Sequence, residues 1–235
     1  MSNRVLPLAA AGALLLCGAA ALGEPMIGGV AQKDYNGAKG ARADAAAGEI
    51  HYRDEVFAGE TVTTPAGGST ALRLRDATTI RIGGASTVVL DRFVYDPDAG
   101  TGEAAISFSK GIFRFVTGGI KNKEAVQLRT PTTALTIRGT NLRIHVTGDG
   151  ATTVAVDEGA VDIAPCGGGE VKRATIGFVV RVSAACNGAE TVAGDSFPSD
   201  PAVDGDDGPR RAGGGRNSDR PGQPERSPPD RGNNG

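Results

Sequence analysis

The feature that most constrains this chain is a regular alternation of apolar and polar residues, broken at short intervals by glycine or aspartate. Between residues 72 and 82 the apolar positions are Leu72, Leu74, Ile80 and Ile82, and arginines stand between them. A period of two is typical of strands with one buried face. Asp76-Ala77-Thr78 separates the two runs and has the composition of a turn. We therefore expect two strands joined by a turn.

The same pattern recurs along most of the chain. Alternating apolar residues are found at 113–115, 126–128, 135–137, 142–146 and 154–163, with glycine-rich or acidic turns between them. No ten-residue helical pattern stands out, and Val, Ile and Thr are the common residues of the apolar runs. Many short strands predict an all-β fold, a single rolled, solenoid- or sandwich-like domain. No exact repeat is visible, so the pattern does not establish a regular solenoid.

The N-terminus has the pattern of a secretory signal peptide over residues 1–23. Arg4 supplies the positive charge, an apolar run extends from Leu6 to Leu22, and small residues favour cleavage before Glu24. Two alternatives stay open. The run could be retained as a membrane anchor, or Cys17 could be lipidated.

The rest of the chain divides by composition into three parts. Residues 24–47, rich in Ala and Gly, are expected to be a linker or a leading strand, and residues 48–193 to be the β domain. Residues 194–235, rich in Pro and Gly, are expected to form a disordered tail, because such a segment buries too little apolar area to offset its ordering entropy.

Two cysteines, Cys166 and Cys186, are left once the signal peptide is removed. An even number in an exported chain favours a disulfide, and their spacing fits no zinc pattern. We expect no metal and no cofactor.

Charge and motifs argue against two classes of function. The 25 basic and 27 acidic residues give a net charge of −2, which provides no general attraction to nucleic acid. The chain lacks a Gly-x-Ser-x-Gly elbow, a Walker loop and a His-Glu-x-x-His helix. His51 and His145 are its two histidines, and we expect both to be exposed. We therefore predict that the protein is not an enzyme.

Several motifs occur in a fixed order. Residues 54–90 read DEVFAGETVTTPAGGSTALRLRDATTIRIGGASTVVL; KGIFRFV follows at 110–116, RTPTTA at 129–134, IRGT at 137–140 and VAVDEGAV at 154–161. Together they resemble the FecR domain. The resemblance covers about residues 48–182.

The resemblance implies a compact, rolled all-β domain outside the cytoplasm, periplasmic or secreted in a bacterium. The family is named for a regulator that couples an iron-siderophore transporter to a sigma factor. Because three residues precede Arg4 and the apolar run, we expect an exported form without the cytoplasmic anti-sigma segment.

Two groups of residues that contain arginines are candidate binding surfaces. The first is a partner-binding surface around Arg129, Arg138 and Thr140, for which a structural corner is the rival interpretation. The second is the row Arg73, Arg75 and Arg81, which could hold an anionic polymer or lipid headgroup or could be an ordinary solvated face.

From these features we expect a non-catalytic extracytoplasmic binding or scaffold module that interacts with an envelope protein or polymer. A periplasmic signalling or sensing component of a FecR-type regulatory system is the alternative. Contact with a membrane is expected only through the N-terminal segment, if it is not cleaved.

Overall fold

The structure of the protein is a computed structural model, and it describes residues 25–31, 37–42 and 46–205. The expected signal peptide, Cys17 and residues 206–235 of the expected tail lie outside the described residues. The described strands belong to one compact unit that ends at Asp204. No helix in the described ranges is long and apolar enough to cross a membrane.

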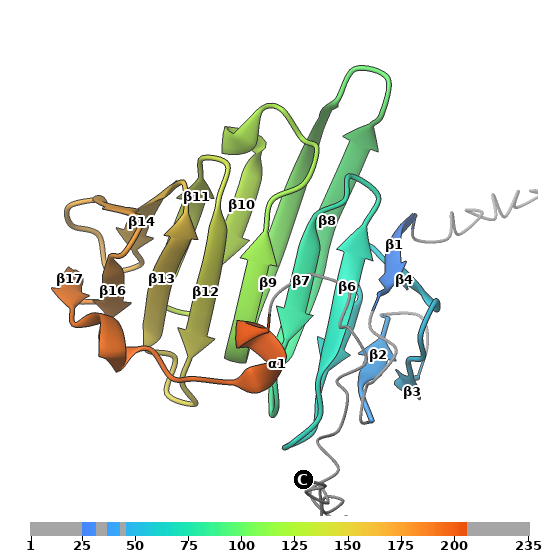
Figure 1. The fold of residues 1–235 in the computed structure, drawn as a ribbon, viewed down its shortest axis with the longest axis horizontal. Coiled ribbons are helices and arrows are strands. Elements are labelled where there is room, and N and C mark those ends of the chain that lie inside the picture. The colour runs from blue at the N-terminus through green and yellow to red at the C-terminus, as the bar shows by residue number, and fades with distance from the viewer. Residues whose placement is uncertain (1–24, 32–36, 43–45, 206–235) are drawn as a thin grey trace, which may run out of the picture. The chain divides into compact units, whose positions relative to one another are not determined.

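The expected all-β fold is confirmed (Figure 1). The strands are β1 Met26–Val30, β2 Lys39–Ala41, β3 Gly48–Glu49, β4 Glu55–Phe57, β5 Thr61–Thr63, β6 Thr70–Leu74, β7 Thr79–Ile82, β8 Thr87–Asp96, β9 Thr101–Val116, β10 Val126–Arg129, β11 Thr133–Ile137, β12 Asn141–Val146, β13 Thr152–Glu158, β14 Ala160–Pro165, β15 Lys172–Thr175, β16 Val179–Val182 and β17 Ala189–Val192. The helices are η1 Lys123–Ala125, η2 Gly194–Ser196 and α1 Pro201–Asp204.

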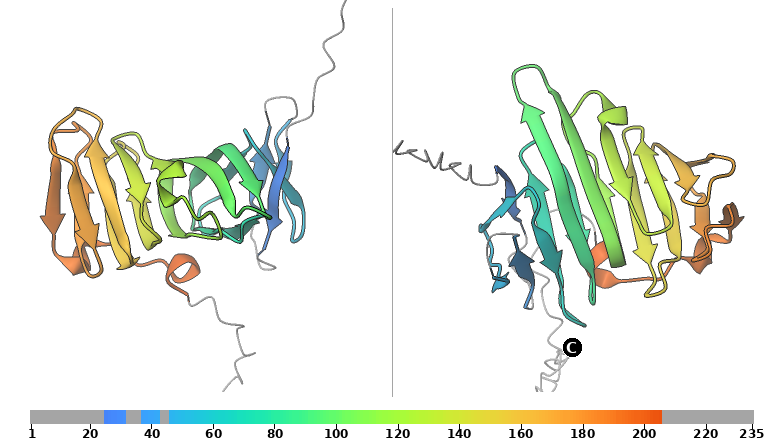
Figure 2. Two further views of the ribbon diagram at one scale, coloured as in Figure 1. Left: turned by 90° about the horizontal axis from the view of Figure 1, so that it is seen from above. Right: turned by 180° about the vertical axis from the view of Figure 1, so that it is seen from behind.

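Hydrogen bonds connect all the strands in one network, which divides into two layers. Sheet A has the order β4-β1-β6-β7-β9-β12-β13-β16-β17. Sheet B has the order β3-β2-β5-β8-β9-β10-β11-β14-β15. Figure 2 shows the two layers facing each other, with the chain winding from one to the other. Only β9 belongs to both sheets among the described strands.

The core lies between the two sheets. Because strand side chains alternate, every second residue points inward, and the inward residues of both sheets form one buried cluster. Ile80, Phe113 and Leu142 come from sheet A, and Leu128 and Ile163 from sheet B; each is fully buried.

Strand β9 bends from sheet B into sheet A at Gly111. Lys110 pairs with Thr87 of β8, whereas Gly111 pairs with Val146 of β12. Gly111 has a φ of 112°, a conformation that suits glycine, and a Cβ there would collide with the Ser86 side chain. Inside the bend, the Phe108 and Phe113 rings lie 4.7 Å apart.

At both ends the ordered unit extends beyond the expected domain of residues 48–193. Of the two expectations for residues 24–47, a leading strand describes β1, which pairs with β4 and β6. Residues 194–204, which we expected to begin the tail, instead pack on the outer face of sheet A. Average composition concealed this because two apolar residues, Phe197 and Val203, supply the anchors in an otherwise polar segment.

Candidate functional site

The outer face of sheet A carries a row of arginines. Arg81 of β7 pairs in register with Arg114 of β9, and Arg114 pairs with Arg143 of β12. We call these three residues the arginine row. Adjacent strands are about 4.8 Å apart, so the row places three cationic side chains side by side on one face. The inward neighbours of these arginines are core residues, which fixes the outward direction of the row.

A row of this kind opposes folding unless anions or polar groups face it, because like charges directly opposite each other on a sheet repel. Arg114 Nε donates a hydrogen bond to Asn141 Oδ1 at 3.0 Å. Arg143 holds Asp157 in a bidentate pair, with Nη2 to Oδ1 and Nε to Oδ2 both at 3.0 Å. The face is therefore adapted to negative charge.

Arg143 also contacts the segment that follows β17. Its Nη1 lies 3.5 Å from Asp204 Oδ1, and its guanidinium lies over the Phe197 ring at 4.8 Å from the centroid. Cation–π contact and a carboxylate thus meet on one arginine of the row.

The expected row of Arg73, Arg75 and Arg81 is only partly a row. Arg73 pairs with Thr79 and Arg81 with Ala71, so these two arginines lie on the outer face of sheet A but two residues apart along the strands. Arg75 follows the end of β6. The arginine in register with Arg81 is Arg114 of β9, which in turn pairs with Arg143 of β12; both lie more than thirty residues away along the chain.

The outer face of sheet B carries paired charges. Asp162 accepts hydrogen bonds from Arg173 Nε at 2.6 Å and from Arg138 Nε at 3.2 Å. The Arg173 hydrogen bond, followed by that of Arg138, holds the pKa of Asp162 below its usual value. Arg92 and Glu103 form a further pair at 3.1 Å.

The predicted partner surface around Arg129, Arg138 and Thr140 is spread out. Arg129 pairs with Ala134 at one end of the β10–β11 hairpin, whereas Arg138 follows Ile137 at the other end. Arg129 is exposed and bonds Gln127 at 3.0 Å.

Thr140 does not belong to an accessible surface, since its side chain is only 3% exposed. Its backbone N–H donates to Thr117 Oγ1 at 2.7 Å, and its carbonyl accepts from the same hydroxyl at 2.6 Å. The Ile-Arg-Gly-Thr motif therefore closes a corner between β11 and β12, with Gly139 at a φ of 65°.

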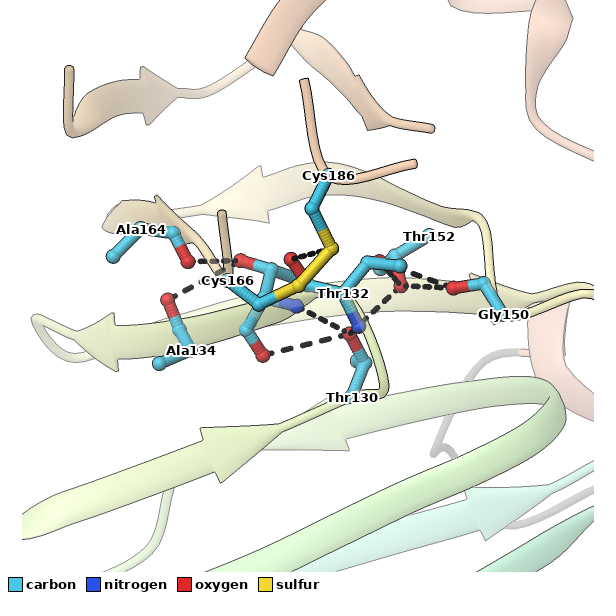
Figure 3. Close-up of a disulfide and its surroundings, with 9 residues drawn as sticks. Thr130, Thr132, Ala134, Gly150, Thr152, Ala164, Cys166 and Cys186 are labelled. Atoms are coloured by element: carbon cyan, nitrogen blue, oxygen red, sulfur yellow. Dashed lines mark hydrogen bonds between the residues drawn. A yellow bond between two sulfur atoms is a disulfide. The ribbon is translucent and has the colours of Figure 1, made fainter. Parts of the chain in front are cut away.

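The Thr-Pro block forms another corner, which Figure 3 shows beside the disulfide. Thr130 and Thr132 both hydrogen-bond the Thr152 hydroxyl, at 2.7 and 2.9 Å. The Cys166 N–H donates to the Thr132 carbonyl at 2.8 Å, and Cys166 is bonded to Cys186. The expected disulfide is thus present. Beside it, the Thr-Pro block connects the start of β11 with the start of β13 and the end of β14 through these hydrogen bonds.

The two histidines occupy different surroundings. His51 is exposed, and its Nδ1 lies 3.3 Å from Asp54 Oδ2. His145 is half-buried on the outer face of sheet A, where it pairs with Ile112 and Thr153. Burial, with a smaller contribution from Arg181, lowers the pKa of His145.

Glu60 is a buried carboxylate of the Gly-Glu motif. Its Oε2 accepts the Phe57 N–H at 2.9 Å and closes the turn between β4 and β5. Burial raises the pKa of Glu60, although the Phe57 hydrogen bond and Arg42 act in the opposite direction. Over the described ranges, no group of three or more His, Cys, Asp or Glu side chains could hold a metal ion.

Sequence reasoning missed Arg114 and Arg143 as surface residues of interest. Each stands between apolar residues, a signal that places it on an outer face but names no neighbours. The missing information was strand order, which local alternation does not contain.

A comparison with family models finds one match, described as FecR protein, over residues 60–162. The match confirms the resemblance seen in the motifs. No curated protein matches the chain.

Two crystal structures of a protein from Parabacteroides distasonis ATCC 8503, described as a candidate anti-sigma factor, are similar to this chain at 13% identity. Their TM-scores are 0.45 and 0.43, and each alignment covers 57% of this chain. The alignment spans 59% of the length of that protein.

Proposed function

This chain contains a FecR domain, and from that premise we propose that it is a non-catalytic binding module that works outside the cytoplasm in a FecR-type regulatory system. We propose further that it binds an envelope protein through the outer face of sheet A.

The observation that carries the proposal is the arginine row. Guanidinium groups bind carboxylates with two parallel hydrogen bonds, so three of them in register favour an acidic partner surface. Among the described pairings of sheet B, no three arginines face one another in register; Arg92 pairs with Glu103, and Arg138 and Arg173 share Asp162. Complementary charge of this kind sets specificity and association rate.

Two further features support the non-catalytic and extracytoplasmic parts of the proposal. The space between the described strands of the two sheets is filled by one apolar cluster. The Cys166–Cys186 disulfide is typical of oxidising compartments such as the periplasm.

Site-specific photo-crosslinking in cells tests the proposed face. The probe replaces Thr79, which lies beside Arg81 on the outer face of sheet A, or Thr136, a matched threonine on the outer face of sheet B. We expect adducts to an envelope protein from Thr79 and not from Thr136. Adducts from Thr136 alone, or from neither position, would contradict the proposal.

Charge reversal adds a second arm. Arg81→Glu with Arg114→Glu should reduce the Thr79 adducts at least tenfold, because attraction to an acidic partner becomes repulsion. The control pair is Arg129→Glu with Arg138→Glu, which reverses charge on sheet B. Loss of adducts in the control pair alone would instead assign the contact to the surface predicted around Arg129 and Arg138.

A self-contained sensing component is the second candidate, favoured by the family match. The two differ in the fate of residues 4–22. N-terminal sequencing of the exported protein should begin near Glu24 for a released binding module, whereas an intact N-terminus would favour a membrane-tethered sensor.

A further inference from the structure

The segment after β17 crosses the outer face of sheet A and reaches the arginine row. We call residues 193–204 the strap. It contains η2 and α1, and Figure 1 shows it running from β17 beneath β13 and β12 to α1, which lies in front of β9 and β7.

The strap is held by two apolar anchors. Phe197 and Val203, 8% and 0% exposed, pack on Ile112, Ala155 and Val179. These three residues point outward from sheet A, so the strap covers an apolar strip beside the arginine row.

The polar anchor is Arg143. Asp157 of β13 holds one edge of the guanidinium, and the strap supplies the carboxylate of Asp204 and the face of Phe197. The strap therefore presents an aromatic ring and an acid to a member of the proposed partner surface.

Hydrogen bonds within the strap also hold the Asp204 carboxylate in place. Asp204 Oδ2 accepts hydrogen bonds from Ser199 Oγ at 2.7 Å and from the Asp200 N–H at 2.9 Å. Among the described pairings, none joins residues 193–204 to a strand, so the strap is held by side chains and can open without disturbing the sheet.

We infer that the strap is an internal occupant of the partner surface. The partner is a polypeptide segment with an aromatic residue followed by a carboxylate, which takes the places of Phe197 and Asp204 on Arg143. This inference rests on the proposed function and adds the chemistry of the partner and its competition with the strap.

A polypeptide fits this surface better than a uniform polyanion. The strip of Ile112, Ala155 and Val179 needs apolar side chains, which a phosphate or glycan polymer lacks. Carboxylate and ring together match the two kinds of contact that Arg143 makes.

A labelled synthetic peptide of residues 193–204 tests the inference by binding to the full chain. With the strap docked, the apparent dissociation constant equals the intrinsic constant divided by the fraction of molecules whose strap is open. We expect Phe197→Ala with Val203→Ala to release the strap and tighten peptide binding at least tenfold over the unaltered protein.

The control pair is Tyr52→Ala with Val94→Ala. These residues are 42% and 53% exposed and lie between β3 and β4 and in β8 of sheet B, so these substitutions should leave peptide affinity unchanged. Asp204→Asn, which keeps side-chain size, should tighten binding in the same direction by a smaller factor, and it decides the question if the double variant fails to fold.

Arg143 provides the specificity test. Adding Arg143→Met to the strap-released protein should abolish binding, as should a peptide whose Phe and final Asp are replaced by Ala and Asn. Equal affinity in all proteins, or tight binding that survives Arg143→Met, would overturn the inference.

The outcomes separate this inference from the proposed function. Thr79 adducts without peptide binding would reject the competing strap alone. Peptide binding without Thr79 adducts would reject the proposed envelope partner alone.

Discussion

At the scale of single residues, the family motifs mainly satisfy backbone groups at turns. Asp76 accepts both the N–H and the hydroxyl of Thr78, and that hydroxyl accepts the N–H of Gly118. Glu60 likewise accepts a hydrogen bond from the backbone N–H of Phe57. These side chains explain the spacing of the motifs without any chemistry on a substrate.

Glu60 makes folding stability depend on pH. Because its folded pKa is raised above the usual 4.5, the folded state favours the neutral acid. Its favourable contribution is present below pH 4.5 and is lost as pH rises through the raised pKa. Glu60→Gln removes the charge and keeps an acceptor for Phe57, so we expect a variant that is more stable than the unaltered protein at pH 7 and equal to it at low pH.

Urea denaturation from pH 4 to pH 8 measures this difference. Glu49→Gln, which alters an exposed carboxylate of β3, is the control and should show no comparable trend. A Glu60→Gln protein that is less stable at pH 7 would show that the ionised acid is stabilising.

Gly111 is the residue on which the β9 bend depends. Gly111→Ala should destabilise the protein by roughly 2 kcal/mol or more, because its φ of 112° disfavours a side chain and the new Cβ would meet Ser86. Gly148→Ala, at a position with nothing within 4 Å of a Cβ, should change stability by less than about 0.5 kcal/mol. Equal effects in thermal unfolding would show that the bend tolerates a side chain.

At the scale of elements, the disulfide joins the loop after β14 to the loop after β16. It therefore links the C-terminal strands of sheet B to the C-terminal strands of sheet A. Cys166→Ser with Cys186→Ser should lower the free energy of unfolding by about 3 kcal/mol, as expected for a loop of 20 residues.

Denaturation with and without reductant measures this effect. Reductant should destabilise the unaltered protein and leave the double variant unchanged. In the native protein, both thiols should resist alkylation until they are reduced; alkylation without reductant would contradict the bridge.

At the scale of the whole ordered unit, β9 and a single core make the two sheets interdependent. We expect one cooperative unfolding transition, with the same midpoint for residues of both sheets. Leu128→Ala in sheet B and Leu142→Ala in sheet A, both fully buried, should each cost about 2–5 kcal/mol and shift both midpoints together.

Residue-resolved NMR during urea denaturation follows amides of β14 and β6 separately. A shift confined to the mutated sheet would indicate stepwise, repeat-like unfolding instead.

Local sequence patterns determined much of this protein. Alternation predicted the inward and outward faces of β6, β7 and β12, because side-chain direction in a strand follows from sequence position alone. Turn residues marked the breaks, and the even number of cysteines, with the export expected from the N-terminal pattern, indicated their pairing.

Tertiary structure alone decided which outward residues became neighbours. Arg81, Arg114 and Arg143 form a row because β7 and β12 pair on either side of β9, and strand order depends on packing across the whole core. The strap was hidden for the same reason. Phe197 and Val203 are anchors only because the fold places Ile112, Ala155 and Val179 beneath them, and no local pattern records that surface.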